Sequence, residues 1–233
     1  MTKCACGDPY DERVTDDREV AATRASYDAT AGLYVRAIGT EISDSIEAAL
    51  DRSILQEFAS SFAHGERVAD LGCGPGRVAA HLAASGVDVV GIDLSIAMLE
   101  IGRRAHPNLR VAVGDLAALP IADCSLDGAA CWYSIIHTAP ERLESVFREI
   151  ARVVVSGGLV LFAFQAGSGE RIPRTDVQGV PVALINYRHN PGDVVRRLVS
   201  TGFEVRSCVV RERELAHEST AQAFVVARLT ATN

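Results

Sequence analysis

The segment Val68–Arg77 constrains the fold of this chain more than any other part of the sequence. It reads VADLGCGPGR, so an apolar run ends in a carboxylate and is followed at once by a turn that contains three glycines. Glycine adopts positive φ without strain and has no Cβ atom, which lets a ligand lie against the backbone. A strand, a glycine turn and a helix in this order form one edge of a nucleoside site at the carboxyl end of a parallel sheet.

Short apolar runs alternate with helical patterns after Gly65. The expected strands are 66–71, 87–92, 109–113, 127–132 and 158–165, and the expected helices are 76–85, 95–104 and 140–154. This alternation predicts an α/β domain in which a parallel sheet carries helices on both faces.

The regions that flank this core have other patterns. From Glu19 to Phe62 apolar residues recur at helical spacing, and Gly32 and Gly39 predict breaks between two or three helices. Beyond the core, the expected elements are a β-rich run over 177–187, a helix over 191–202 and strands over 203–210 and 221–229.

These patterns divide the chain into a flexible tail, 1–17, and a single domain, 18–233. Within the domain we expect a helical lid, then a cofactor-binding core, then a substrate-side insertion with the last strands. They span 18–64, 65–165 and 166–233.

The composition narrows the class of protein. The formal net charge is −7 and the basic residues are scattered, which argues against a nucleic-acid partner. No apolar run approaches the roughly 18–20 residues of a membrane span. The acid-rich start lacks the pattern of a secretory signal, so we expect a cytoplasmic protein without a membrane partner. The six cysteines are scattered, and Cys4 and Cys6 are too close in sequence for a zinc site; we expect neither a disulfide framework nor a metal.

A second carboxylate ends the next apolar run, Val87–Asp93, 23 positions after Asp70. A carboxylate at the end of this strand can accept hydrogen bonds from both hydroxyls of a ribose, as in dinucleotide sites. A dinucleotide fingerprint would need its third glycine at position 77, where this chain has arginine. The pattern therefore argues against a nicotinamide-dependent oxidoreductase.

With Asp70 ahead of its glycines, the turn resembles motif I of class I S-adenosylmethionine-dependent methyltransferases, in particular the bacterial members that act on small molecules. Leu126–Trp132 is similar to the fourth strand of that family. Glu149–Leu159 is similar to its helix-turn-strand exit, with Ser156 at the usual proline. The resemblance covers about 66–165 and implies a Rossmann-like, doubly wound, mostly parallel sheet of seven strands with an N-terminal helical lid and an antiparallel last strand.

The resemblance also implies a cofactor, S-adenosyl-L-methionine, with S-adenosyl-L-homocysteine as product. It assigns the ribose to Asp93, the adenine amino group to Asp115 and the adenine walls to the apolar residues after Asp93. Asp70 and Asp115 also have structural interpretations, as the brace of a turn and an ordinary strand-end acid. The expected cofactor-binding residues are Tyr34, Asp70, Gly72, Cys73, Gly74, Gly76, Asp93, Leu94, Met98, Gly114, Asp115, Leu116 and Cys131.

The loop Trp132–Pro140 follows the fourth strand and, in the family, faces the methyl group. Its His137 has a pKa suited to proton removal near neutrality, so His137 and Tyr133 are the catalytic candidates. The alternative role for His137 is to brace the loop. Further candidates for acceptor contacts are Tyr27, Tyr187, Arg188, His189, His217 and Glu218.

These observations predict an enzyme that methylates a small metabolite, with oxygen as the expected acceptor atom. Methyl transfer to nitrogen or sulfur and a non-catalytic S-adenosylmethionine-binding protein remain as alternatives. The loop lacks the Asn/Asp-Pro-Pro-Tyr signature of many enzymes that methylate nucleic-acid bases or glutamine amides. We expect a monomer or a homodimer.

Overall fold

The computed structural model describes the fold of residues 12–230 and the side chains from residue 18 onward. The first part of the predicted tail, including Cys4 and Cys6, lies outside the described residues. A helix already begins at Glu12, inside the segment predicted as tail. Within residues 12–230, no helix has the length and apolar character needed to cross a membrane.

A seven-stranded sheet forms the centre of the molecule, and its order is β3-β2-β1-β4-β5-β9-β8. The strands are β1 (Arg67–Leu71), β2 (Asp88–Asp93), β3 (Arg110–Val113), β4 (Leu126–Trp132), β5 (Val154–Gln165), β8 (Phe203–Arg211) and β9 (Gln222–Leu229). The first five are parallel, and β9 runs antiparallel to both of its neighbours. The predicted fold class is confirmed, including the antiparallel last strand.

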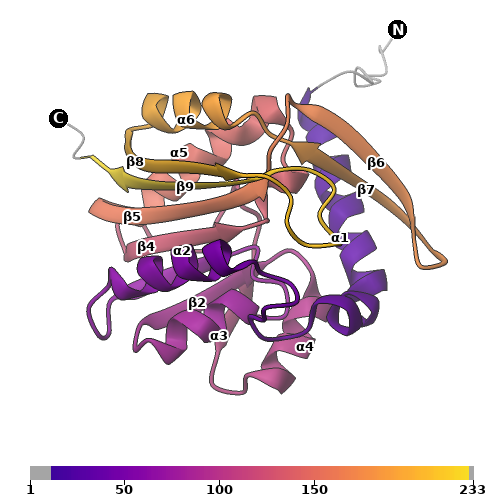
Figure 1. The fold of residues 1–233 in the computed structure, drawn as a ribbon, viewed down its shortest axis with the longest axis horizontal. Coiled ribbons are helices and arrows are strands. Elements are labelled where there is room, and N and C mark those ends of the chain that lie inside the picture. The colour runs from indigo at the N-terminus through magenta and orange to yellow at the C-terminus, as the bar shows by residue number, and fades with distance from the viewer. Residues whose placement is uncertain (1–11, 231–233) are drawn as a thin grey trace, which may run out of the picture.

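Helices cover both faces of this sheet (Figure 1). They are α2 (Ala49–Ser60), α3 (Arg77–Ala84), α4 (Ile96–Ala105), α5 (Leu143–Val153) and α6 (Pro191–Ser200), with short 3₁₀ turns η1 (Ile135–His137) and η2 (Pro140–Arg142) before α5. Leu55 and Leu82 of α2 and α3 pack into the core on one face. Phe147 and Leu198 of α5 and α6 pack into the core on the other face.

The order of the strands creates a crevice beside β1. From β1 the chain moves outward to β2 and β3, then returns to place β4 on the other side of β1. Connections that leave in opposite directions open a space at the carboxyl ends of the two central strands, which is where ligands bind in sheets of this kind. The glycine turn after Leu71 lies at this point.

One long helix, α1 (Glu12–Ile38), precedes the sheet. The predicted break at Gly32 is wrong, because the helix continues through that position. Glycine inside a helix costs about 1 kcal/mol relative to alanine, and packing of α1 against both α4 and the strand β7 described below offsets this cost. The predicted break at Gly39 is confirmed, since this residue has a φ of 83° directly after the helix.

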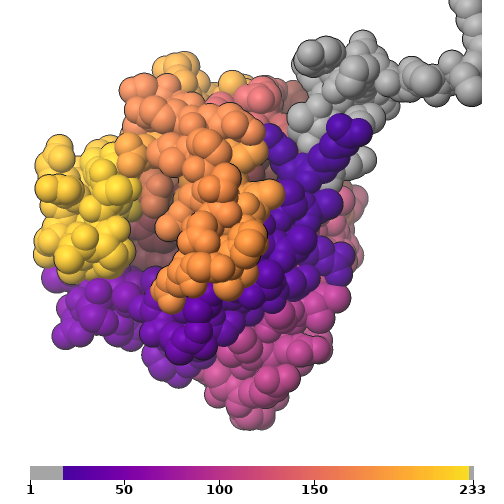
Figure 2. Space-filling model, turned by 90° about the vertical axis from the view of Figure 1, so that its right-hand side faces the viewer, coloured from indigo at the N-terminus to yellow at the C-terminus, as the bar shows by residue number. Residues whose placement is uncertain are grey.

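A hairpin between β5 and α6 stands apart from the main sheet. Its strands, β6 (Glu170–Val177) and β7 (Val180–Arg188), pair only with each other. The turn residues Gln178 and Gly179 have φ values of 51° and 85°, as a tight two-residue hairpin requires. In Figures 1 and 2 the hairpin lies along α1, which packs against β7. The sequence showed a β-rich run here but not this pairing.

Candidate functional site

A cavity of about 930 Å³, including its open mouth, lies at the carboxyl ends of the central strands. The glycine turn, the residues after β2, β3 and β4, and one face of α1 form its walls. Eleven of the predicted site residues line it: Tyr34, Gly72, Gly74, Asp93, Leu94, Met98, Gly114, Asp115, Leu116, Tyr133 and His137. The topology therefore brings together residues that are more than a hundred positions apart.

The glycines of the turn serve different purposes. A Cβ atom on Gly72 would lie 2.2 Å from Cβ of Ser134, and one on Gly76 would lie 2.7 Å from Leu109, so packing excludes side chains at both positions. At Gly74 no atom lies within 4 Å of such a Cβ atom. Gly74 lines the cavity, so its missing side chain leaves a cradle open beside the backbone.

Asp93 fastens the glycine turn to the end of β2. One carboxylate oxygen accepts a hydrogen bond from the Gly74 amide at 2.7 Å, and the other accepts one from the Ser95 amide at 2.8 Å. An ionised carboxylate has about four lone-pair sites, so both oxygens can accept further bonds from a ligand. Burial raises the pKa of Asp93 and the nearby Asp28 adds to this rise, while the two amide bonds oppose it.

Asp115 lines the cavity after the end of β3. Its Oδ1 accepts a hydrogen bond from the Ala117 amide at 2.9 Å. The apolar side chains of Leu94, Leu116 and Met98 line the same cavity. The sheet side of the cavity therefore offers two carboxylates among apolar residues.

Four of the predicted cofactor-binding residues lie outside the set that lines the cavity. The Asp70 side chain is buried and accepts a hydrogen bond from the Ala79 amide of α3 at 2.9 Å, so it braces the turn. Burial raises its pKa to about 7. Cys73 and Cys131 are buried in the core, and Gly76 precedes α3. These four residues therefore support the walls of the cavity from behind, and none of them is among the residues that line it.

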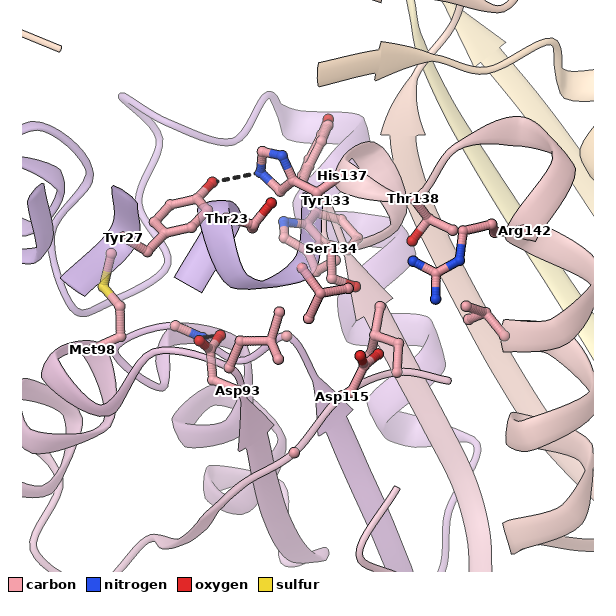
Figure 3. A pocket seen from close by; sticks show the side chains of 18 of the residues that line it. Thr23, Tyr27, Asp93, Met98, Asp115, Tyr133, Ser134, His137, Thr138 and Arg142 are labelled. Carbon is pink, nitrogen blue, oxygen red and sulfur yellow. Dashed lines mark hydrogen bonds between the residues drawn. The ribbon is translucent and has the colours of Figure 1, made fainter. Parts of the chain in front are cut away.

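His137 forms a hydrogen-bonded pair with Tyr27 of α1. The Tyr27 hydroxyl lies 2.7 Å from Nε2 (Figure 3). On the other side of the ring, the Ile185 carbonyl oxygen lies 2.9 Å from Nδ1. A carbonyl only accepts, so Nδ1 carries the proton, and in the neutral imidazole Nε2 then accepts from Tyr27. Burial lowers the pKa of His137 and raises that of Tyr27, so both groups are neutral at pH 7.

The carboxylates and this pair occupy opposite sides of the cavity. Asp93 and Asp115 extend into it from one side, and Tyr27 and His137 face it from the other (Figure 3). The cavity thus has two carboxylates on the sheet side and a hydrogen-bonded tyrosine–histidine pair on the side of α1.

Tyr133, the second catalytic candidate, lines the cavity but is not part of this pair. Its backbone is strained, with a φ of 57°, and its amide donates to the Ala163 carbonyl at 2.8 Å. The ring packs edge-on against Trp132, with the ring centroids 5.8 Å apart. Strained residues concentrate at functional sites, and here the strain turns the chain from β4 into the loop that carries His137.

The remaining sequence candidates lie outside the residues that line the cavity, and most of them form contacts within the fold. His189 is buried and its Nε2 lies 2.9 Å from the Ile135 carbonyl, while Glu218 accepts bonds from the buried Arg211. The Tyr187 hydroxyl donates to Glu19 at 3.4 Å, Arg188 donates to Ser219, and His217 is exposed. Among the side chains of residues 18–230, no group of three or more metal-ligating residues could hold an ion.

Several residues that line the cavity were absent from the sequence candidates. They are Val20, Thr23, Trp132, Ser134, Thr138, Arg142 and Val146. Tyr27, which the sequence offered as a candidate for an acceptor contact, does line the cavity. Tyr27 and Tyr34 are seven positions apart and therefore share one face of α1. Their ring centroids are 6.2 Å apart.

Comparisons with known proteins agree with this geometry. A family model described as a methyltransferase domain matches residues 68–158. The malonyl-[acyl-carrier protein] O-methyltransferase of Erwinia billingiae is 36% identical over 118 residues, which are 50% of this chain and 46% of that protein. The demethylmenaquinone methyltransferase of Beutenbergia cavernae is 38% identical over 99 residues, 42% of this chain and 40% of that protein. The chain thus spans less than half the length of these relatives.

A solved structure extends the likeness beyond the core. The 1,6-didemethyltoxoflavin-N1-methyltransferase of Burkholderia thailandensis, solved with 1,6-didemethyltoxoflavin and S-adenosylhomocysteine, superposes with a TM-score of 0.68. The match covers 99% of this chain and 94% of that one, at 14% identity. At this identity the likeness establishes the fold alone.

Proposed function

We propose that this chain, which belongs to the class I S-adenosylmethionine-dependent methyltransferases, transfers a methyl group from S-adenosylmethionine to an oxygen atom of a small molecule. The single observation that carries the proposal is the cavity itself. It places the open cradle at Gly74 and the carboxylate of Asp93 opposite a hydroxyl–imidazole pair.

The residues present fit an adenosyl group. The cradle at Gly74 gives access to the backbone, and Asp93 keeps lone pairs free for the two ribose hydroxyls. Leu94 and Leu116 line the same cavity and would pack against a flat base, and the Asp115 carboxylate would accept a hydrogen bond from its exocyclic amino group. When bound, S-adenosylmethionine supplies a methyl group on a positively charged sulfur, which an oxygen nucleophile can attack in line.

The pair of Tyr27 and His137 gives the acceptor's proton a route. An acceptor hydroxyl that donates to the Tyr27 oxygen passes its proton there as the new carbon–oxygen bond forms. Tyr27 in turn passes its own proton to Nε2 of His137. The imidazolium so formed keeps its bond to the Ile185 carbonyl and later releases one proton to water. The acceptor loses one proton and one proton reaches water, so Tyr27 and His137 return to their starting states.

The test is a two-part assay on the purified chain. Calorimetry with S-adenosylhomocysteine measures cofactor binding, and mass spectrometry follows methylation of a panel of hydroxyl, carboxylate, amine and thiol acceptors. We expect binding together with methylation of oxygen acceptors. Binding without any methylation would favour a non-catalytic binding protein, and methylation confined to amines or thiols would overturn the choice of oxygen.

A further inference from the structure

We propose that a second cavity, beside the first, holds an anionic group of the methyl acceptor, a carboxylate or a phosphate, through Arg171 and Arg174. This inference rests on the proposed function and adds the class of acceptor. The second cavity lies between α1 and the hairpin β6–β7 and encloses about 860 Å³, including its open mouth. Figure 2 shows the hairpin lying against α1 on this side of the molecule.

The two cavities meet at the acid–base pair. Thr23 and His137 line both of them, and Ile185, whose carbonyl binds His137, lines the second. An acceptor seated in the second cavity therefore reaches the Tyr27 hydroxyl, with the adenosyl side of the first cavity beyond it. The hairpin supplies one wall of this cavity and takes no part in the main sheet.

The charge of the second cavity is unlike that of the chain as a whole. The chain carries a net charge of −7, yet Arg18, Arg171 and Arg174 line this cavity, with Glu19 as the single carboxylate among its lining residues. Arg171 lies 3.5 Å from Glu19. Two positive charges therefore remain uncompensated among the residues that line the cavity.

Arg174 is the residue best placed to meet an acceptor. It is exposed and forms no ion pair within residues 18–230, where side chains are described. The positive charge of Arg174 acts to lower the pKa of both Tyr27 and His137. A guanidinium binds a carboxylate or a phosphate with two parallel hydrogen bonds. The acceptor inferred here carries its anionic group at Arg174 and its reacting hydroxyl at Tyr27.

The experiment measures how tightly three small probes bind to wild type and to variants, each saturated with S-adenosylhomocysteine. The probes are 4-hydroxybenzoate, phenyl phosphate and the neutral 4-hydroxybenzamide, all followed by calorimetry. The variants are Arg171→Gln, Arg174→Gln and the double variant. Arg206→Gln, an exposed arginine of β8 that pairs with Glu204, is the matched control.

We expect at least one anion to bind wild type and the control more tightly than the amide does. Loss of a charge-assisted pair should weaken that anion about 10-fold to 100-fold in the double variant. S-adenosylhomocysteine should bind all variants equally. If 4-hydroxybenzoate binds more tightly, the acceptor's anionic group is a carboxylate. If phenyl phosphate binds more tightly, it is a phosphate.

Other results overturn the inference. They are equal binding of the anion by wild type and the double variant, equal binding of amide and anion, or no binding of either anion to wild type. Failure of the proposed function has a different signature, since anion binding would persist in a chain that methylates nothing. Weaker binding of S-adenosylhomocysteine by the double variant would also overturn the inference about the arginines, because they would then act through the cofactor site.

Discussion

At the scale of single residues, the tautomer of His137 determines what the site can do. Because the Ile185 carbonyl fixes the proton on Nδ1, the lone pair on Nε2 points at the Tyr27 hydroxyl. In the proposed mechanism the imidazole therefore acts on an acceptor through the Tyr27 hydroxyl. The hypothesis that His137 acts as the base thus gains a partner from a helix 110 positions away in sequence.

Removal of either member of this pair should slow methyl transfer. We expect His137→Ala and Tyr27→Phe to lower turnover about 10²-fold to 10⁴-fold, the usual contribution of a positioned base. The dissociation constant for S-adenosylhomocysteine should change little, and His217→Ala, at an exposed histidine, should behave as wild type. If the variants retain most of their turnover, His137 is not the base and its role is to brace the loop.

The pH dependence follows from the same burial. The pKa of His137 lies below its ordinary value of 6.5, because burial outweighs the bond to Ile185, and Arg174 lowers it further. The neutral base therefore persists below pH 6.5, and the wild-type rate should fall only as the pH drops through this lowered pKa. A profile of rate against pH checks this, and the fall should be absent from the residual rate of His137→Ala.

The substitution Asp93→Ala tests the proposed cofactor site. Asp93→Ala removes an acceptor for two hydroxyls, so we expect a loss of about 2–4 kcal/mol in affinity for S-adenosylhomocysteine. Asp88→Ala, at the start of the same strand and outside the cavity, serves as the control. Calorimetry beside a thermal melt separates binding from folding, and an unchanged dissociation constant in Asp93→Ala would refute the assignment.

At the scale of elements, the turn between β1 and α3 shows how one motif combines packing and binding. Gly72 must be glycine because Ser134 fills the space beside it, whereas Gly74 faces open space. The sequence alone makes these residues look equivalent. Only the return of β4 beside β1 separates their roles.

Substitution at the two glycines should therefore give opposite results. Gly74→Val should abolish measurable binding of S-adenosylhomocysteine and keep a cooperative melt, with about 1–2 kcal/mol lost to its positive φ. Gly72→Ala should lower the free energy of unfolding by about 1–3 kcal/mol through overpacking against Ser134. Thermal melts and calorimetry on both variants check this. If Gly74→Val bound the cofactor normally, the cradle would have no role.

Sequence reasoning succeeded where local signals decide the structure. The five parallel strands of the sheet were predicted to within a few residues, because an acid or a glycine turn marks the ends of several of them, whereas β6 was missed. The break at Gly32 was wrong because the contacts that keep α1 straight come from α4 and β7, which are distant in sequence. Asp70 was assigned to the ligand because its partner, the amide of Ala79, is found only once the helix folds back over the turn.

At the scale of the whole molecule, α1 covers the cavity and connects it to the hairpin. Val20, Thr23, Tyr27 and Tyr34 all contribute to the cavity wall, so a bound cofactor should hold this helix in place. We expect amide exchange over 18–38 to slow when S-adenosylhomocysteine is added, with no change in α6. Hydrogen exchange read by mass spectrometry checks this, and equal rates with and without ligand would make α1 a fixed wall.

The pairing of β6 only with β7 has a consequence for how such a protein can change. A strand inside the main sheet cannot gain or lose a residue without shifting the register of its neighbours. The hairpin meets that sheet at its base, where Ala166 and His189 form an isolated bridge, and its two strands otherwise pair with each other. The length of the hairpin beyond this bridge can therefore vary while the register of the sheet stays as it is. Transplanting another hairpin between β5 and α6 would be a route to a new acceptor in a chain that keeps the same methyl donor.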